Sequence, residues 1–130
     1  MNGDACARTC DAMSTGSVFK IFRLSEWQDL ASSGRFIGSA DDRRDGFIHL
    51  SYGPQVAATL ARHYSAEPRV VVAEFDAVAL GYALKAEPSR GGALYPHFYG
   101  ILSKEDVLRF VELACGAEGF ALPDWCGANE

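Results

Sequence analysis

The chain has 130 residues, a length that suits one domain with a substantial core. Hydrophobic residues make up 48% of the sequence and charged residues 22%, which excludes a wholly disordered chain. The net charge is −5, so we do not expect a protein that grips a long nucleic-acid backbone. No stretch approaches the ~20 apolar residues that span a bilayer, so we expect no membrane segment.

The sequence predicts three regions. Residues 1–16 are small, polar and aperiodic, as in a flexible leader, and they lack the apolar segment of a secretory signal. Residues 17–114 form a single α+β domain, and residues 115–130 form a C-terminal tail. We therefore expect a cytoplasmic protein whose cysteines are free thiols, with a shared metal site as the alternative. These cysteines are Cys6, Cys10, Cys115 and Cys126.

The domain is predicted to begin with a strand and a short helix. Residues 18–23 are rich in β-branched and aromatic side chains, as is typical of a strand. Ser25 and Gln28 form a capping-box pattern, which predicts a helix with Trp27 as a core anchor. Residues 38–46 mix turn formers with charges of both signs, and we expect a solvated loop there.

A short strand, a second helix and a central strand follow. Residues 47–51 are predicted to be extended, and Pro54 suits the first turn of a helix that ends near residue 64. Residues 69–75 are almost continuously apolar, which indicates a strand in the centre of a sheet. Glu74 within this strand needs a buried partner. The candidates for this partner are Arg62, Arg69 and Lys85.

The second half of the domain is predicted to be mostly strand. We expect a helical turn over 76–81, strands over 82–87 and 95–100, and a capped turn over 103–106. For residues 107–113, strand is favoured over helix. The order β-α-β-α-β-β-β-β, with two short helices, predicts an α+β fold and not a regularly alternating parallel sheet.

Two polar residues of the predicted strand over 47–51 suggest a ligand-binding site. His49 and Ser51 share one strand face because side chains alternate, and they lie beside a predicted helix N-terminus. An imidazole, a hydroxyl and first-turn N–H groups together suit an anionic or polar ligand. The alternative is an exposed polar face on which Ser51 caps the helix.

A second histidine lies on a later strand. His97 and Tyr99 share a strand face, next to a proline that restricts the backbone. Two histidines that hydrogen-bond a ligand are favoured over a metal site, because the sequence names no clear third metal ligand. His63 lies on the polar side of the second helix, and we expect it to be solvated.

Glu87 ends a predicted strand immediately before Pro88, at the edge of a glycine-rich loop. A carboxylate at this position suits the orientation of a sugar hydroxyl or the stabilisation of positive charge on a ribose ring. The alternative is a loop glutamate surrounded by water.

Several blocks, in this order, resemble the bacterial domain of unknown function 952 family over about residues 17–114. The blocks are Val18–Ile21, Trp27, Gly38-Ser39, Asp45-Gly46-Phe47-Ile48-His49-Leu50-Ser51, Gln55, Glu87 and Pro96-His97-Phe98-Tyr99-Gly100. That family is more remotely similar in fold to ADP-ribosyltransferases, including RNA 2′-phosphotransferases that consume NAD. Those enzymes hold NAD in the cleft of a small split β-sheet. The resemblance therefore implies a small split or mixed β-sheet with two short helices, like that of an ADP-ribosyltransferase.

The resemblance implies that the domain binds a nucleotide-like ligand, NAD or ADP-ribose, with NAD as a substrate and with no metal. It implies catalytic roles for His49, Glu87 and His97. It implies ligand-binding roles for Lys20, Ser51, Gln55 and Tyr99. Lys20 occupies a first-strand position at which ADP-ribosyltransferase relatives often carry histidine. Two functions therefore stay open: an ADP-ribosyl-transferring enzyme, and a non-catalytic module that binds a ligand or a partner.

Overall fold

The computed structural model describes residues 16–89 and 91–126. The first fifteen residues of the predicted leader, with Cys6 and Cys10, lie outside the described residues. The strands are β2 (Ser17–Arg23), β3 (Arg35–Phe36), β4 (Ile48–His49), β5 (Ser51–Tyr52), β6 (Arg69–Asp76), β7 (Leu84–Pro88), β8 (Leu94–Phe98), β9 (Leu102–Ser103) and β10 (Val107–Ala114). The α-helices are α2 (Leu24–Ser33), α3 (Ala40–Asp45), α4 (Val56–His63) and α5 (Ala77–Leu80). Three 3₁₀ turns are η2 (Gly53–Gln55), η3 (Gly81–Ala83) and η4 (Lys104–Asp106).

The strands form three sheets with the orders β10-β6-β2-β5, β3-β9 and β4-β8-β7. Every pairing between the named strands is antiparallel. The α+β class, the split sheet and the central place of β6 are confirmed, as is strand at 107–113. The predicted mixed sheet is wrong in its strand directions, because the segments between neighbouring strands, such as residues 24–68 between β2 and β6, bring the chain back in the opposite direction.

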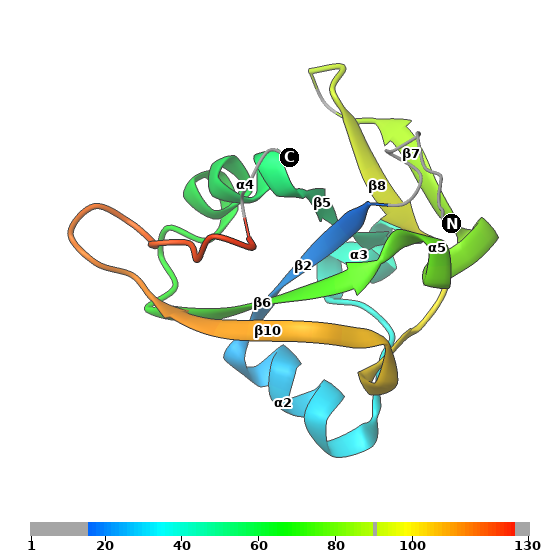
Figure 1. The fold of residues 1–130 in the computed structure, drawn as a ribbon, viewed down its shortest axis with the longest axis horizontal. Helices are drawn as coiled ribbons and strands as arrows, with labels where there is room; N and C mark the ends of the chain where they lie inside the picture. Colours follow the sequence, from blue (N-terminus) through cyan, green and yellow to red (C-terminus); the bar gives the residue numbers. More distant parts are fainter. Residues whose placement is uncertain (1–15, 90, 127–130) are drawn as a thin grey trace.

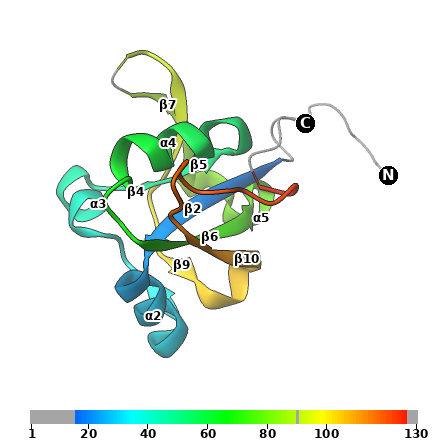
Figure 2. The ribbon, with the colours of Figure 1, turned by 90° about the vertical axis from the view of Figure 1, so that its left-hand side faces the viewer.

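The four-stranded sheet carries core on both faces. Strand alternation sends Val18 and Phe22 of β2 into one cluster with Leu30 of α2. The alternate residues Phe19 and Ile21 enter a second cluster with α4. Figures 1 and 2 both show α2 and α4 on opposite sides of the strands. Both faces of β2 and β6 are therefore buried, which explains the continuous apolar run that predicted β6.

The start of α2 and the partners of Glu74 differ from the predictions. Helix α2 begins two residues earlier than Ser25 implied, and the Glu26 carboxylate accepts a hydrogen bond from the backbone N–H of Arg23 at 2.9 Å. The partners of Glu74 are Arg109 (Nε to Oε1 2.6 Å) and the Ser17 hydroxyl. Neither was a candidate, because register between distant strands decides which side chains meet.

Residues 40–45, predicted as part of a solvated loop, form helix α3. The Ser39 hydroxyl accepts a hydrogen bond from the Asp42 N–H at 3.1 Å, and the Asp42 carboxylate accepts one from the Ser39 N–H at 2.9 Å. This reciprocal pair is a capping box, and Gly46 with φ 90° ends the helix in the left-handed region. The pattern Ser39-x-x-Asp42 followed by Gly46 was the local signal for α3.

The predicted strand over 47–51 is divided between two sheets. Strand β4 pairs with β8, whereas β5 pairs with β2 of the larger sheet. Leu50 lies between β4 and β5, and its N–H donates to the Pro96 carbonyl at 3.0 Å. The chain therefore passes from the three-stranded sheet to the four-stranded sheet within two residues.

Residues 115–126, predicted as part of a tail, pack against the α4 face of the large sheet. Phe120, Leu122 and Trp125 lie against the second core cluster, and Cys126 belongs to it. The Trp125 ring stacks on Phe19 with 6.5 Å between ring centroids. Both described cysteines are free thiols, Cys115 exposed and Cys126 buried. In the described part of the chain, no helix has the length and apolar character needed to cross a bilayer.

Phe22→Ala tests the first core cluster. Phe22 is fully buried and makes edge contacts with Trp27 and Phe36. We expect the free energy of unfolding in urea to fall by about 3–5 kcal/mol, because the truncation leaves a cavity. Phe110→Ala is the matched control, since Phe110 also contacts Trp27 but is 54% exposed. Equal losses in the two variants would contradict this account of the core.

Candidate functional site

The three-stranded sheet brings the two site histidines together. In its register His49 of β4 lies opposite His97 of β8, and Lys85 of β7 lies on the other side of His97. The two imidazole rings have centroids 5.8 Å apart in an edge-on arrangement. Residues separated by 48 positions in the chain therefore share one face of a small sheet.

Glu87 connects the second histidine to a tyrosine on the same face. Its Oε1 accepts a hydrogen bond from the Tyr99 hydroxyl at 2.7 Å and lies 2.8 Å from His97 Nδ1. An ionised carboxylate only accepts hydrogen bonds, so His97 donates through Nδ1–H. The bonds from Tyr99 and then His97 lower the pKa of Glu87, and the same Glu87 bond raises the pKa of Tyr99. Glu87 is thus held as an anion at the surface.

Phe47 covers this cluster, and sequence reasoning did not single it out. Its ring stacks on His97 with 4.0 Å between centroids. It also contacts the rings of His49 at 4.7 Å and Tyr99 at 5.3 Å. The side chain of His97 is consequently only 7% exposed, whereas that of His49 is 41% exposed. The alternation of Phe47 with His49 was the only available signal, because side chains two residues apart share a strand face.

Behind His49 lies a buried ion pair that the sequence did not reveal. Lys20 of β2 and Asp42 of α3 are 3% and 1% exposed, with 3.0 Å between Nζ and Oδ2. Lys20 also donates to the His49 carbonyl at 3.0 Å. The ammonium of Lys20 thus faces the interior, away from any ligand at the surface, because α3 supplies a carboxylate there. Asp42 was hidden in a segment predicted to be a solvated loop.

Asp42 contacts both the backbone N–H and the ring of His49 from the protein interior. Its Oδ1 accepts from the His49 N–H at 3.0 Å and lies 2.6 Å from His49 Nδ1. Burial alone raises the pKa of Asp42, but the bond with His49, the charge of Lys20 and two backbone N–H groups outweigh it. The pKa of Asp42 therefore lies far below its usual range, and the carboxylate stays ionised. Gly38, with φ 121°, permits the close approach, because a Cβ there would lie 2.8 Å from the Asp42 Cβ.

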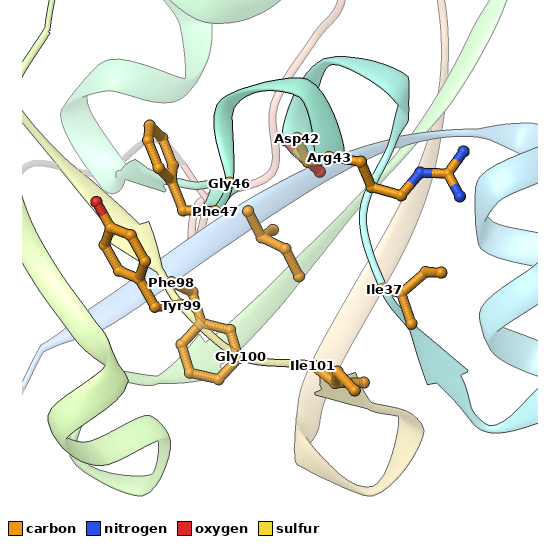
Figure 3. A pocket seen from close by; sticks show the side chains of 10 residues that line it. Ile37, Asp42, Arg43, Gly46, Phe47, Phe98, Tyr99, Gly100 and Ile101 are labelled. Carbon is orange, nitrogen blue, oxygen red and sulfur yellow. The ribbon is translucent and has the colours of Figure 1, made fainter.

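An open hollow adjoins this face where β4 begins and β8 ends. Its volume is about 330 Å³, and Figure 3 shows Phe47 and Tyr99 on one side with Ile37, Ile101 and Arg43 on the other. Phe98 lies between these two groups in the same view. The hollow thus combines apolar side chains with the polar groups of Asp42, Arg43 and the backbone. Phe47 and Tyr99 belong both to the hollow and to the His97–Glu87 cluster.

The remaining predicted site residues lie elsewhere. The Ser51 hydroxyl is buried beside the Thr59 hydroxyl at 3.3 Å, because the chain changes sheet at Leu50. Gln55 accepts from the Tyr52 N–H at 3.0 Å and donates to the Leu94 carbonyl at 2.7 Å, so its amide closes a turn. Helix α4 is preceded by the 3₁₀ turn η2, so Ser51 does not cap it. The structure therefore gathers His49, Glu87, His97 and Tyr99, and it leaves Ser51 and Gln55 outside this cluster.

His63 is exposed on α4. Within residues 16–89 and 91–126, no group of three or more histidine, cysteine, aspartate or glutamate side chains is arranged to hold a metal ion.

Comparison with family models matches residues 21–110, a stretch that contains Asp42, Phe47 and the gathered cluster. The chain belongs to the family described as Protein of unknown function (DUF952). The resemblance noted in the sequence is confirmed at this level. The more remote resemblance to ADP-ribosyltransferases stays a prediction.

Solved structures similar to this DUF952 chain include the X-ray crystal structure of protein CC0527 from Caulobacter crescentus. It is 41% identical, covers 80% of this chain and 91% of its own, and has a TM-score of 0.75. The solution NMR structure of CC0527 is 41% identical, covers 80% of this chain and 90% of its own, and has a TM-score of 0.72. A search of curated proteins found no match.

Asp42→Asn tests the buried ion pair. We expect a loss of about 3–5 kcal/mol in the free energy of unfolding at neutral pH, because Lys20 keeps a buried charge without its counter-charge. A carboxyl whose folded pKa is lowered contributes stability above its ordinary pKa of 3.8 and loses it as the pH falls. The stability of the wild type should therefore drop below about pH 4 more than that of the variant.

Urea unfolding at neutral pH and at about pH 3 measures both effects. Asp29→Asn, which changes an exposed carboxylate of α2, is the control and should leave stability nearly unchanged. Equal acid sensitivity of wild type and Asp42→Asn would contradict an ionised buried Asp42.

Tyr99→Phe tests the hydrogen bond that lowers the pKa of Glu87. Without the phenolic donor at 2.7 Å, the pKa of Glu87 should move upward toward its ordinary value. Carboxyl ¹³C chemical shifts followed through an acid titration measure this pKa. Tyr82→Phe, at a tyrosine that is 99% exposed, should leave it unchanged.

Proposed function

We propose that the domain is a cytoplasmic protein that binds a nucleotide-like ligand of the NAD or ADP-ribose type. The supporting observation is the cluster of Phe47, Glu87, His97 and Tyr99 beside the open hollow. Small-molecule sites combine apolar walls with a few fixed polar groups, and this cluster has both features.

The ring-bearing part of such a ligand suits the apolar side of the site. Phe47 and Tyr99 offer aromatic edges and faces at the hollow, and aromatic pairs gain about 0.5–1.5 kcal/mol beyond simple burial. A volume of about 330 Å³ lies at the lower end of the range for small-molecule sites and suits one ring system with its sugar. The neighbouring Arg43 suits a phosphate oxygen, because a guanidinium donates two parallel hydrogen bonds.

Glu87 is suited to bind the sugar part of the ligand. Its Oε1 is occupied by Tyr99 and His97, while the side chain is 34% exposed. The second oxygen of an ionised carboxylate accepts hydrogen bonds from hydroxyl groups, and a ribose presents two neighbouring hydroxyls. The contacts with Tyr99 and His97 hold the carboxylate in one orientation before any ligand arrives, which reduces the entropy cost of binding.

A second candidate function, ADP-ribosyl transfer, uses the same anion. The bond between ribose C1′ and the nicotinamide nitrogen breaks, and its electron pair leaves with nicotinamide. A nucleophile such as water then bonds to C1′ and releases a proton. An ionised Glu87 favours this step because it stabilises the positive charge that develops on the ribose ring.

Glu87→Gln tests ligand binding. We expect ADP-ribose or NAD to bind the full chain with a dissociation constant below about 1 mM in isothermal titration calorimetry. The variant should bind about 10–100-fold more weakly, because a charged acceptor is lost. Glu112→Gln is the control, since Glu112 is also an exposed strand glutamate paired with an arginine, on β10. Absence of binding heat for both ligands with the wild type would refute the proposal.

Nicotinamide release separates transfer from binding alone. If wild type bound to NAD releases nicotinamide and folded Glu87→Ala and His49→Ala do not, the chain is a transferase or hydrolase. Binding without release identifies a non-catalytic module.

A further inference from the structure

His49 lies between two carboxylates that differ in their freedom to move. On one side, Asp42 Oδ1 is 2.6 Å from Nδ1, and its side chain is 1% exposed. On the other side, Asp45 Oδ2 is 3.0 Å from Nε2, and its side chain is 34% exposed. Asp42 is anchored by Lys20 and by the Ser39 N–H, whereas Asp45 is also hydrogen-bonded to Arg44 at the surface.

A neutral imidazole carries one proton and cannot donate to both carboxylates. If the proton sits on Nε2, the lone pair of Nδ1 faces the buried carboxylate of Asp42, and neither group can turn to water. If the proton is on Nδ1, the lone pair of Nε2 faces the Asp45 carboxylate and repels it. Asp45 can then turn into solvent, where Arg44 remains its partner. The cost of the first arrangement is far higher because Asp42 is buried.

We propose that Asp42 is a positioning residue that keeps the proton of neutral His49 on Nδ1, so that Nε2 accepts a hydrogen bond from a hydroxyl group of the ligand. Asp45 occupies the position beside Nε2 in the absence of ligand and is displaced on binding. This assigns a recognition atom to His49 and a supporting role to the Lys20–Asp42 pair. The ligand hydroxyl rests on the proposed function, whereas the placement of the proton does not.

Among the residues that the structure describes, no charged group other than Asp42 and Asp45 contacts the ring of His49. Lys20 reaches the backbone carbonyl of His49 and not the ring. His97 and Phe47 contact the ring only through their own rings. The two aspartates of α3 therefore decide which nitrogen carries the proton.

Nitrogen NMR of the full chain with ¹⁵N-labelled histidines tests the placement of the proton. In alkaline buffer, where histidine rings are neutral, His49 should show a protonated Nδ1 and an unprotonated Nε2. In Asp42→Ala, the proton of His49 should move from Nδ1 to Nε2, where the Asp45 carboxylate accepts it. Lys20→Met should keep the proton on Nδ1, because Asp42 is retained even though the ion pair is lost.

The controls separate positioning from a general loss of structure. A wild-type His49 that resembles His63, or a Lys20→Met variant that loses the Nδ1 proton, would overturn the assignment to Asp42. If Asp42→Ala or Lys20→Met does not fold, the wild-type spectrum still decides.

Addition of ADP-ribose tests the ligand hydroxyl. The Nε2 signal of His49 should shift as its lone pair accepts a hydrogen bond. Asp45→Ala should bind ADP-ribose a few-fold more tightly, because no side chain then has to leave Nε2, in line with the small energy of an exposed contact. Binding that leaves Nε2 unmoved would refute the recognition role of His49. If ADP-ribose binds no variant while the tautomer pattern holds, the proposed function fails and the role of Asp42 stands.

Discussion

The buried ion pair between Lys20 and Asp42 is the interaction on which the candidate site depends. It joins the central strand β2 to helix α3, and both partners also bond to His49 of β4. Such a pair gains little net energy over apolar packing, but losing one partner is costly because the other stays charged and buried. The pair therefore acts mainly by specifying one arrangement, in which α3 and β4 have a single position relative to the large sheet. His49 is the only one of the three side chains that reaches the surface to a large extent.

The second half of the site is built differently. Glu87 and His97 lie on the neighbouring strands β7 and β8 of a protruding hairpin (Figure 1), and Tyr99 directly follows β8. Their hydrogen bonds are local, and the ring of Phe47, the residue before β4, covers them. The register of β4 with β8 thus joins a carboxylate held at the surface to a histidine supported from the interior. The two halves meet at Phe47, which contacts both imidazoles, so this ring has more influence on the site than its sequence context indicated.

The differences between prediction and structure have a common cause. His49 and Ser51 share a face in an uninterrupted strand, but the chain moves between sheets at Leu50, and no local pattern reports that change. Residues 38–46 carried a capping-box signal, yet their many charges indicated a loop. Asp42 can be buried there only because Lys20, from another element, supplies the opposite charge. Lys20 was predicted to meet a ligand and instead meets Asp42. In each case the deciding contact joins residues at least 22 positions apart or depends on strand pairing.

The amino-acid sequence by itself determined the elements with strong periodicity, namely β2, β6 and α4, and it determined the α+β class and the membership of the family. It also marked His49, Glu87, His97 and Tyr99 as chemically notable, because polar groups on short strands are visible in the order of residues. Only the tertiary structure decided that these four side chains lie together, that Ser51 and Gln55 do not join them, and that Lys20 faces Asp42. The physical reason is that periodicity and capping are local properties of the backbone, whereas ion pairs and sheet register depend on which distant segments exclude water from one another.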